Sequence, residues 1–283
     1  MATRWVRTIR ETVRYYGTPT VVLLGLLLIL VGALVRWGGP PDFNLPIILL
    51  GVGCSMVAAG LVAYLNPVTA ELYERILAMG VSHVYPSRNE IERKNWVEWL
   101  RSADQRFVQV GISNSGWRTD TTILPALKDR LEHNVEVKLF FLDPTSSAAG
   151  IRGKEEPHRD TQREIRDTIG YFWAHRELFE EDLKARFKMY VYNATPSLGL
   201  TWTDQLMVAT HYLAAFQNLT SPALFLEPPR FPHRGSNLYK VYAENVKMLE
   251  TNLSTFLRDE NITQFVPQDV LSGWRDKAKG GNK

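Results

Sequence analysis

The sequence predicts an α/β protein built from a transmembrane helical hairpin followed by a mixed sheet that is flanked by helices. The hairpin is predicted by two uncharged apolar runs, Pro19–Val35 and Leu45–Leu65. The sheet is predicted by apolar stretches beyond residue 80 that alternate between strand-like and helix-like spacing. We divide the 283 residues into a cytoplasmic basic segment (1–18), a two-helix transmembrane hairpin (19–67), a cytoplasmic α/β domain (68–259) and a C-terminal tail (260–283).

The lengths of the two apolar runs are the basis for the hairpin. Each helical residue adds about 1.5 Å and a bilayer core is about 30 Å thick, so the second run spans it and the first comes close. Only Arg36–Asn44 separates the runs, and its Gly-Gly-Pro-Pro sequence belongs to neither helix. A cleaved signal peptide is the competing interpretation, but it leaves the second run unexplained.

The charges beside the runs predict the orientation of the hairpin. The loop between the runs carries Arg36 against Asp42 and sums to zero, whereas the segment before the first run is basic. The positive-inside rule then places both termini in the cytoplasm, with two spans in the inner membrane. The basic residues of the first segment are Arg4, Arg7, Arg10 and Arg14.

The remaining charge is balanced. Of the 33 basic and 30 acidic side chains, five arginines and two acids lie before residue 71, which leaves 28 of each in the rest of the chain. A neutral domain lacks the broad basic surface that drives sequence-independent binding of DNA or RNA. The one cysteine, Cys54, has no partner for an intramolecular disulfide.

The first elements after the hairpin are short. We predict a helix over Val68–Met79, ended by Gly80, because glycine readily takes the positive φ that closes a helix. A strand over Val81–Tyr85 follows. Ser87 then opens a helix by a capping-box pattern.

A strand, a helix and a second strand come next. Phe107–Ile112 and Val135–Leu142 are apolar strand-like runs, and Leu124–Leu131 between them has helical spacing. A unit of this length predicts a right-handed crossover and a parallel strand pair. The loop Ser113–Thr122 then lies at the carboxyl edge of the sheet, where open α/β sheets bind ligands.

The second half of the domain continues the alternation of helices and strands. The expected elements are a long helix over Arg159–Ala185, strands over Phe187–Tyr192, Leu200–Leu213 (with a turn near Asp204) and Ser221–Leu226, and a last helix over Asn237–Leu257.

Several of these segments resemble one family. The similar segments are Gly80–Arg88, the tryptophan-bearing helix after it, Val110–Ser113, Leu139–Pro144, Gln205–Tyr212 and Ser221–Leu224. Together they resemble bacterial phospholipase-D-like domains over roughly residues 80–257. The resemblance implies a phospholipase-D-like mixed sheet.

The catalytic motif of that family is incomplete here. Active members use His-x-Lys-x4-Asp, in which the histidine attacks a phosphodiester and the lysine holds phosphate oxygens. His211 matches the histidine, but Leu213 replaces the lysine and Asn218 the aspartate. Without that positive charge the developing oxyanions lose their stabilisation, so the resemblance implies a non-catalytic member. The alternative is a phosphodiesterase or phospholipase with His211 as nucleophile.

The best candidate for a ligand site is the loop after the first strand of the parallel pair. It offers hydroxyls, backbone N–H groups, one guanidinium and an aromatic ring. The alternative is a plain strand-to-helix connection in which Ser and Asn form turns and caps. The predicted ligand-binding residues are Ser113, Asn114, Ser115, Trp117, Arg118, Asp143 and Tyr212.

Other charged and metal-binding groups give weaker signals. No histidine or acid stands at metal-ligand spacing with His211, so we expect no metal and no cofactor. A basic cluster surrounds the start of the long helix, but acidic residues are interleaved with it. This mixture favours a solvent-exposed helix face with ion pairs over a binding site for polyphosphate. The cluster consists of Arg152, Lys154, Arg159, Arg163 and Arg166.

Small residues recur every four positions in the second apolar run, at Gly51, Ser55 and Ala59. Such a stripe allows helices to approach closely, either within the hairpin or between protomers of a homo-oligomer. We favour packing within the hairpin, and both interpretations remain open.

These observations predict a membrane-anchored cytoplasmic sensor or effector. Its non-catalytic phospholipase-D-like domain binds a nucleotide-like or phosphate-type ligand, or a cytoplasmic protein partner, and signals to the hairpin in the lipid bilayer. By analogy, the output is perturbation of the inner membrane in anti-phage defence. The alternatives are the His211 hydrolase and a membrane scaffold that recruits a cytoplasmic protein.

Overall fold

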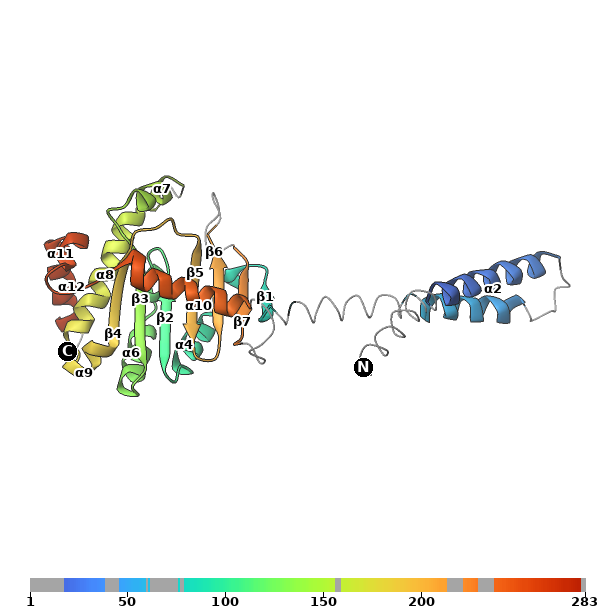
Figure 1. Cartoon of the computed structure of the whole chain (residues 1–283), viewed down its shortest axis with the longest axis horizontal. Coiled ribbons are helices and arrows are strands. Elements are labelled where there is room, and N and C mark those ends of the chain that lie inside the picture. The colour runs from blue at the N-terminus through green and yellow to red at the C-terminus, as the bar shows by residue number, and fades with distance from the viewer. Residues whose placement is uncertain are drawn as a thin grey trace, which may run out of the picture. The chain divides into compact units, whose positions relative to one another are not determined.

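The computed structural model describes residues 18–38, 46–59, 61, 76, 79–155, 159–212, 221–228 and 237–280 (Figure 1). The chain divides into two compact units, Met1–Ile76 and Leu77–Lys283. The predicted basic segment before residue 18 and most of the predicted helix over Val68–Met79 lie outside the described residues.

Within the described residues of the first unit lie two apolar helical segments, α2 (Thr18–Gly38) and residues 46–59. They approach closely where Gly25 faces Gly53, since a Cβ on either glycine would fall within 2.8 Å of the other's carbonyl oxygen. The predicted stripe lies elsewhere: Gly51 faces open space, and Ser55 and Ala59 are exposed. Contact within this helix pair therefore depends on glycines outside the stripe.

The helices of this unit overturn the predicted membrane topology. Among the residues that the structure describes, no helix combines the length and the apolar character needed to cross a membrane. This finding contradicts the transmembrane hairpin and the inner-membrane location with both termini cytoplasmic.

The second unit is a mixed α/β domain around one eight-stranded sheet, as the sequence predicts. The strand order is β1-β7-β6-β5-β2-β3-β4-β8. The pairs β2/β3 and β3/β4 are parallel and the others antiparallel, which confirms the predicted parallel pair. The strands are β1 (Val81–Tyr85), β2 (Arg106–Val110), β3 (Glu136–Leu142), β4 (Phe187–Tyr192), β5 (Leu198–Thr203), β6 (Met207–His211), β7 (Ala223–Leu226) and β8 (Ser254–Phe256).

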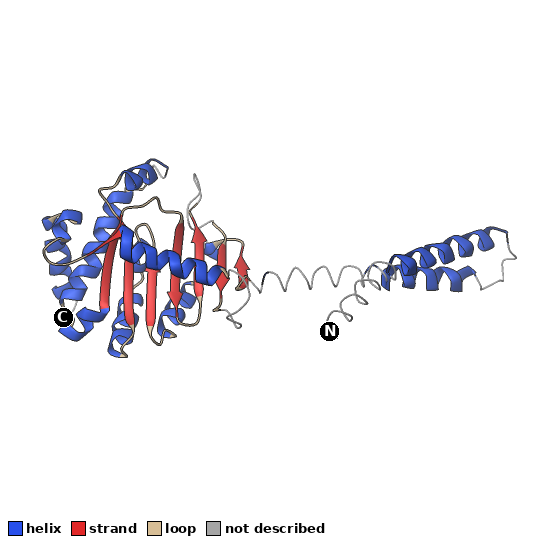
Figure 2. Cartoon of the chain, viewed as in Figure 1, coloured by secondary structure: helices blue, strands red, loops and turns tan. Residues whose placement is uncertain are grey.

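Helices cover both faces of the sheet. One face carries α10, which crosses in front of the strands in Figures 1 and 2, and α4, α6 and α8 lie behind. The helices are α4 (Arg93–Arg101), α5 (Ser115–Thr119), α6 (Ile123–Glu132), α7 (Ser147–Glu155), α8 (Thr161–Glu177), α9 (Glu181–Arg186), α10 (Leu238–Met248), α11 (Ile262–Phe265) and α12 (Gln268–Gly280). A 3-10 turn (Arg88–Glu90) precedes α4 and a π-helical turn (Leu249–Leu253) follows α10.

The core between the sheet and the helices behind it is aromatic. Phe107, Phe141, Phe172, Trp173 and Phe187 are all fully buried. Removing one such side chain from water contributes about 1.5–3 kcal/mol, so this layer holds the central strands and α8 in fixed positions.

Two predicted helices are shorter in the structure. The helix expected over Arg159–Ala185 breaks into α8 and α9 because Phe179 turns inward against Phe187, with their ring centroids 5.9 Å apart. The helix expected over Asn237–Leu257 ends early, since residues 254–256 pair with β4. In both cases tertiary contacts override the local helical pattern.

The segment assigned as a C-terminal tail contains α11 and α12, and α12 packs along α8. Gly170 permits the contact, because a Cβ there would approach Trp274 Cδ1 to 3.0 Å. Arg275 reinforces it with two hydrogen bonds to the Glu177 carboxylate, at 2.5 and 2.7 Å.

Candidate functional site

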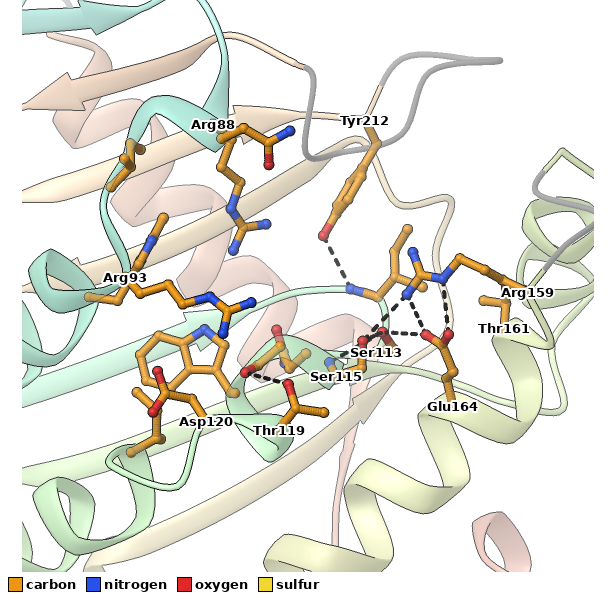
Figure 3. A pocket seen from close by; sticks show the side chains of 18 of the residues that line it. Arg88, Arg93, Ser113, Ser115, Thr119, Asp120, Arg159, Thr161, Glu164 and Tyr212 are labelled. Atoms are coloured by element: carbon orange, nitrogen blue, oxygen red, sulfur yellow. Dashed lines mark hydrogen bonds and ion pairs between the residues drawn. The ribbon is translucent and has the colours of Figure 1, made fainter.

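A cavity of about 530 Å³ lies at the carboxyl ends of β1, β2 and β6, beside the first turn of α8 (Figure 3). This is the edge at which the sequence predicts a ligand site. Segments far apart in the chain form its walls. The lining residues are Arg88, Asn89, Ile91, Arg93, Trp96, Ile112, Ser113, Asn114, Ser115, Gly116, Trp117, Thr119, Asp120, Ile123, Arg152, Arg159, Thr161, Glu164 and Tyr212.

The floor is the loop between β2 and α5, which Asn114 holds in shape. Asn114 has a left-handed backbone with φ of 50°, and its Nδ2 donates to the Phe140 carbonyl at 3.0 Å. Its Oδ1 accepts from Gln109 Nε2 at 3.2 Å, and Gln109 Oε1 accepts from Thr201 Oγ1 at 2.5 Å. A Cβ at Gly111 would collide with the Asn114 amide, so the tight turn requires glycine there. Buried hydrogen bonds thus fix the loop from below.

The wall formed by α8 carries an ion pair. Arg159 Nε donates to Glu164 Oε1 at 2.9 Å, and Arg159 Nη2 donates to Glu164 Oε2. Two loop hydroxyls join this pair: Ser113 Oγ donates to Glu164 Oε2 at 3.4 Å, and Ser115 Oγ accepts from Arg159 Nη2 at 3.4 Å. The dashed lines in Figure 3 join these four side chains, Ser113, Ser115, Arg159 and Glu164.

On the opposite wall, Arg88 points into the cavity without an acidic partner (Figure 3). Its guanidinium lies over the Trp96 ring, 4.8 Å from the centroid. Burial lowers the pKa of this guanidinium, and the nearby Tyr212 partly offsets the effect. Within the described ranges no carboxylate forms an ion pair with Arg88. A desolvated cation of this kind is stabilised by any anion that enters the cavity.

Arg152, on α7, closes a third side. Its side chain is buried, donates to Glu155 Oε2 at 2.5 Å and lies over the Tyr212 ring, 5.5 Å from the centroid. The Tyr212 hydroxyl accepts from the Ile112 N–H at 3.2 Å. These contacts link α7 to the end of β6 and to the floor loop.

The far end of the cavity combines Arg93 with Asp120 (Figure 3). The pKa of Asp120 is lowered because the Thr122 hydroxyl and N–H donate to Oδ1, at 2.5 and 2.9 Å, with a smaller contribution from Arg93. Counted over the whole lining, four arginines face two carboxylates, and the cavity is therefore net positive.

Five of the seven predicted ligand-binding residues line this cavity, namely Ser113, Asn114, Ser115, Trp117 and Tyr212. The other two do not. Arg118 lies over the Trp274 ring of α12, 5.6 Å from its centroid. Asp143 accepts from the N–H and hydroxyl of Thr145, both at 2.7 Å, and so caps its own turn.

His211 lies away from these residues. Its Nε2 is 3.1 Å from the Tyr242 hydroxyl of α10, which covers the other face of the sheet, and His211 is not among the lining residues. Leu213 and Asn218, which replace the lysine and aspartate of the phospholipase motif, lie outside the described residues. The predicted catalytic role of His211 stays a prediction.

Sequence reasoning missed most of the charged lining. Arg88, Arg93, Trp96 and Asp120 carried no motif that marked them as a site. Arg152 and Arg159 were noticed as a basic cluster, but the interleaved acids favoured a solvated face. The signal that could have identified them as site residues was their position in the chain, just after the loop that leaves the carboxyl end of β3.

No group of three or more His, Cys, Asp or Glu side chains that could hold a metal ion occurs in the part of the chain that the structure describes. The lining itself offers guanidinium groups, two carboxylates, hydroxyls and aromatic rings.

Comparison with known proteins gives weak similarities. No protein-family model and no curated protein matches the chain. TrmBL2, an archaeal chromatin protein with a novel mode of DNA binding, is 10% identical at a TM-score of 0.36, over 74% of this chain and 69% of its own. Phosphatidylserine synthase of Haemophilus influenzae is 14% identical at a TM-score of 0.44, over 70% of this chain. This chain spans 45% of the length of the synthase. Because both TM-scores are below 0.5, neither similarity supports a conclusion about the function of this chain.

Proposed function

We propose that the α/β domain is a binding module for a small phosphate-bearing ligand and acts as a sensor rather than as a catalyst. The observation that carries the proposal is Arg88, a desolvated guanidinium that faces the cavity without an acidic partner among the described residues. A charge in this environment is costly until an anion neutralises it. Phosphate oxygens match the planar fork of a guanidinium particularly well.

The size and lining of the cavity support a ligand of nucleotide dimensions. Its volume of about 530 Å³ lies in the range of small-molecule sites, roughly 300–1,000 Å³. The loop hydroxyls offer hydrogen bonds, and Trp96 and Trp117 provide apolar surface. The resemblance to phospholipase-D-like domains agrees with a phosphate ligand, and Leu213 in place of the motif lysine favours binding without turnover.

Calorimetric titration of the full chain tests this proposal. The probes are inorganic phosphate, pyrophosphate, AMP and ATP, with uncharged adenosine as the reference. We expect at least one phosphate compound to bind while adenosine binds more weakly, and we expect Arg88→Gln to weaken that binding about tenfold or more.

The matched control is Arg101→Gln, because Arg101 is an exposed arginine at the end of α4 that does not line the cavity. It should leave the dissociation constant within about twofold of wild type. Absence of binding by every phosphate probe, both to wild type and to a variant that lacks the Glu164 carboxylate, overturns the proposal, as do equal losses in Arg88→Gln and Arg101→Gln.

A further inference from the structure

We propose that Glu164 is a built-in competitor for the ligand's anionic group, so that its carboxylate occupies the position that a phosphate takes on binding. This inference rests on the proposed function of the same cavity. It concerns what limits the affinity of the site rather than whether the site binds anions.

The hydrogen bonds around Glu164 are those expected for a bound anion. Its two oxygens accept from Nε and Nη2 of Arg159, which is a bidentate guanidinium–carboxylate pair. The Ser113 hydroxyl adds a third donor at 3.4 Å, from the loop on the other side of the cavity. Donors from two separate elements therefore converge on one carboxylate that lines the cavity.

The location of Glu164 makes displacement feasible. It stands in the first turn of α8 and its side chain retains 27% of its exposure, so the carboxylate can rotate toward solvent. A phosphate that enters beside an unmoved Glu164 would meet a like charge in a partly desolvated site, which weakens its binding. A phosphate that replaces Glu164 gains the Arg159 fork and the Ser113 hydroxyl, in addition to Arg88 on the facing wall.

Removing the carboxylate charge tests the inference. We expect Glu164→Gln in the full chain to bind AMP and inorganic phosphate about five- to tenfold more tightly than wild type, a coupling within the usual range. The double variant Glu164→Gln/Arg159→Gln should not show this gain in affinity, because the loss of Glu164 strengthens binding by freeing the Arg159 guanidinium from its ion pair.

Asp167→Asn is the charge-matched control. Asp167 lies one turn further along α8, pairs with the exposed Arg163 at 3.8 Å and does not line the cavity. It should change the dissociation constant by less than about twofold. The unfolding temperature of each variant without ligand reports whether it is folded, and Glu164→Ala provides a second variant that lacks the carboxylate.

Three outcomes are distinguishable. Tighter binding by Glu164→Gln alone supports the competitor role, including the case in which wild type shows no detectable binding. If wild type binds through Arg88 and the folded Glu164 variants bind equally or more weakly, the competitor role is overturned and the proposed function stands. If neither wild type nor any variant binds a phosphate probe, the proposed function is overturned and this inference with it.

Discussion

Two arginines, Arg88 in the 3-10 turn after β1 and Arg106 at the start of β2, have nearly the same aromatic contact but differ in whether an acidic side chain pairs with them. The Arg88 guanidinium lies 4.8 Å from the centroid of Trp96, and that of Arg106 lies 4.9 Å from the centroid of Trp202. Arg106 also donates through Nε to Asp204 Oδ1 at 3.3 Å, whereas Arg88 has no ion pair among the described residues. The difference separates an arginine that is paired within the fold from one that we propose binds a ligand.

The same contrast applies to the two ends of β2. At its start, Asp204 Oδ2 accepts three consecutive backbone N–H groups, those of residues 104–106, at 2.7 to 3.2 Å. At its other end the chain opens into the floor loop of the cavity, whose Ser113 and Ser115 hydroxyls face a net positive lining. One end is internally satisfied, and the other is the end at which we propose that an external anion binds.

The largest effect on stability is expected for Asp204→Asn. The substitution removes a charged acceptor of several hydrogen bonds and leaves their donors less well satisfied, at a cost of about 2 kcal/mol in the free energy of unfolding. Urea denaturation at pH 7 measures this cost. Phosphate binding should be unchanged in the folded variant, because Asp204 stands at the opposite end of β2. A loss of binding that equals the Arg88→Gln loss would contradict the separation of the two ends.

The same carboxylate predicts a dependence on pH. Burial acts to raise the pKa of Asp204, but the backbone N–H groups of residues 104–106 and the charge of Arg106 outweigh it, and the net shift is downward. The stabilisation is therefore fully present above the unfolded pKa of about 3.9 and is lost as the pH falls through the lower folded value. Wild type should lose more unfolding free energy than Asp204→Asn over that acidic window. If the unfolding free energies of wild type and Asp204→Asn fall equally over that pH range, Asp204 is not the group responsible for the pH dependence.

The sequence predicted the half of the site that a local pattern defines. An apolar strand, a polar loop and a helix stripe were sufficient to place Ser113–Trp117 at the carboxyl edge of a parallel pair. Arg88 was not predictable in this way, because it reaches the same edge only through the pairing of β1 with β7, more than 130 residues away in the chain. The pairing of Arg159 with Glu164 depends on the position of α8 against that loop, which interleaved charges along a helix do not reveal.

The hairpin shows the opposite failure. Two uncharged runs predicted helices correctly at 18–38 and 46–59, but none of the helices that the structure describes has the length and apolar character needed to cross a membrane. The runs therefore predicted the helical state correctly, and the membrane-spanning role assigned to them was wrong.

A direct comparison of the two arginines is the next prediction. Arg106→Gln removes an ion pair and a ring contact at a partly exposed site and should lower the free energy of unfolding by about 1 kcal/mol. Arg88→Gln removes a ring contact but also a desolvated, unmatched charge, so its stability should stay within about 0.5 kcal/mol of wild type. Urea denaturation of both variants measures the difference. A larger loss for Arg88→Gln would show that Arg88 is a structural residue, like Arg106.

A modest loss of stability and no loss of binding are expected for Tyr242→Phe, which tests whether the face of the sheet under α10 takes part in binding. The variant removes the hydrogen bond between the Tyr242 hydroxyl and His211 Nε2 and should cost about 0.5–1 kcal/mol in unfolding free energy. Phosphate binding should be unaffected, because neither residue lines the cavity. His211→Ala, titrated in parallel, should also retain binding in the folded protein. If both variants lose affinity as Arg88→Gln does, His211 belongs to the ligand site, and the alternative of a hydrolase that uses His211 gains support over a sensor.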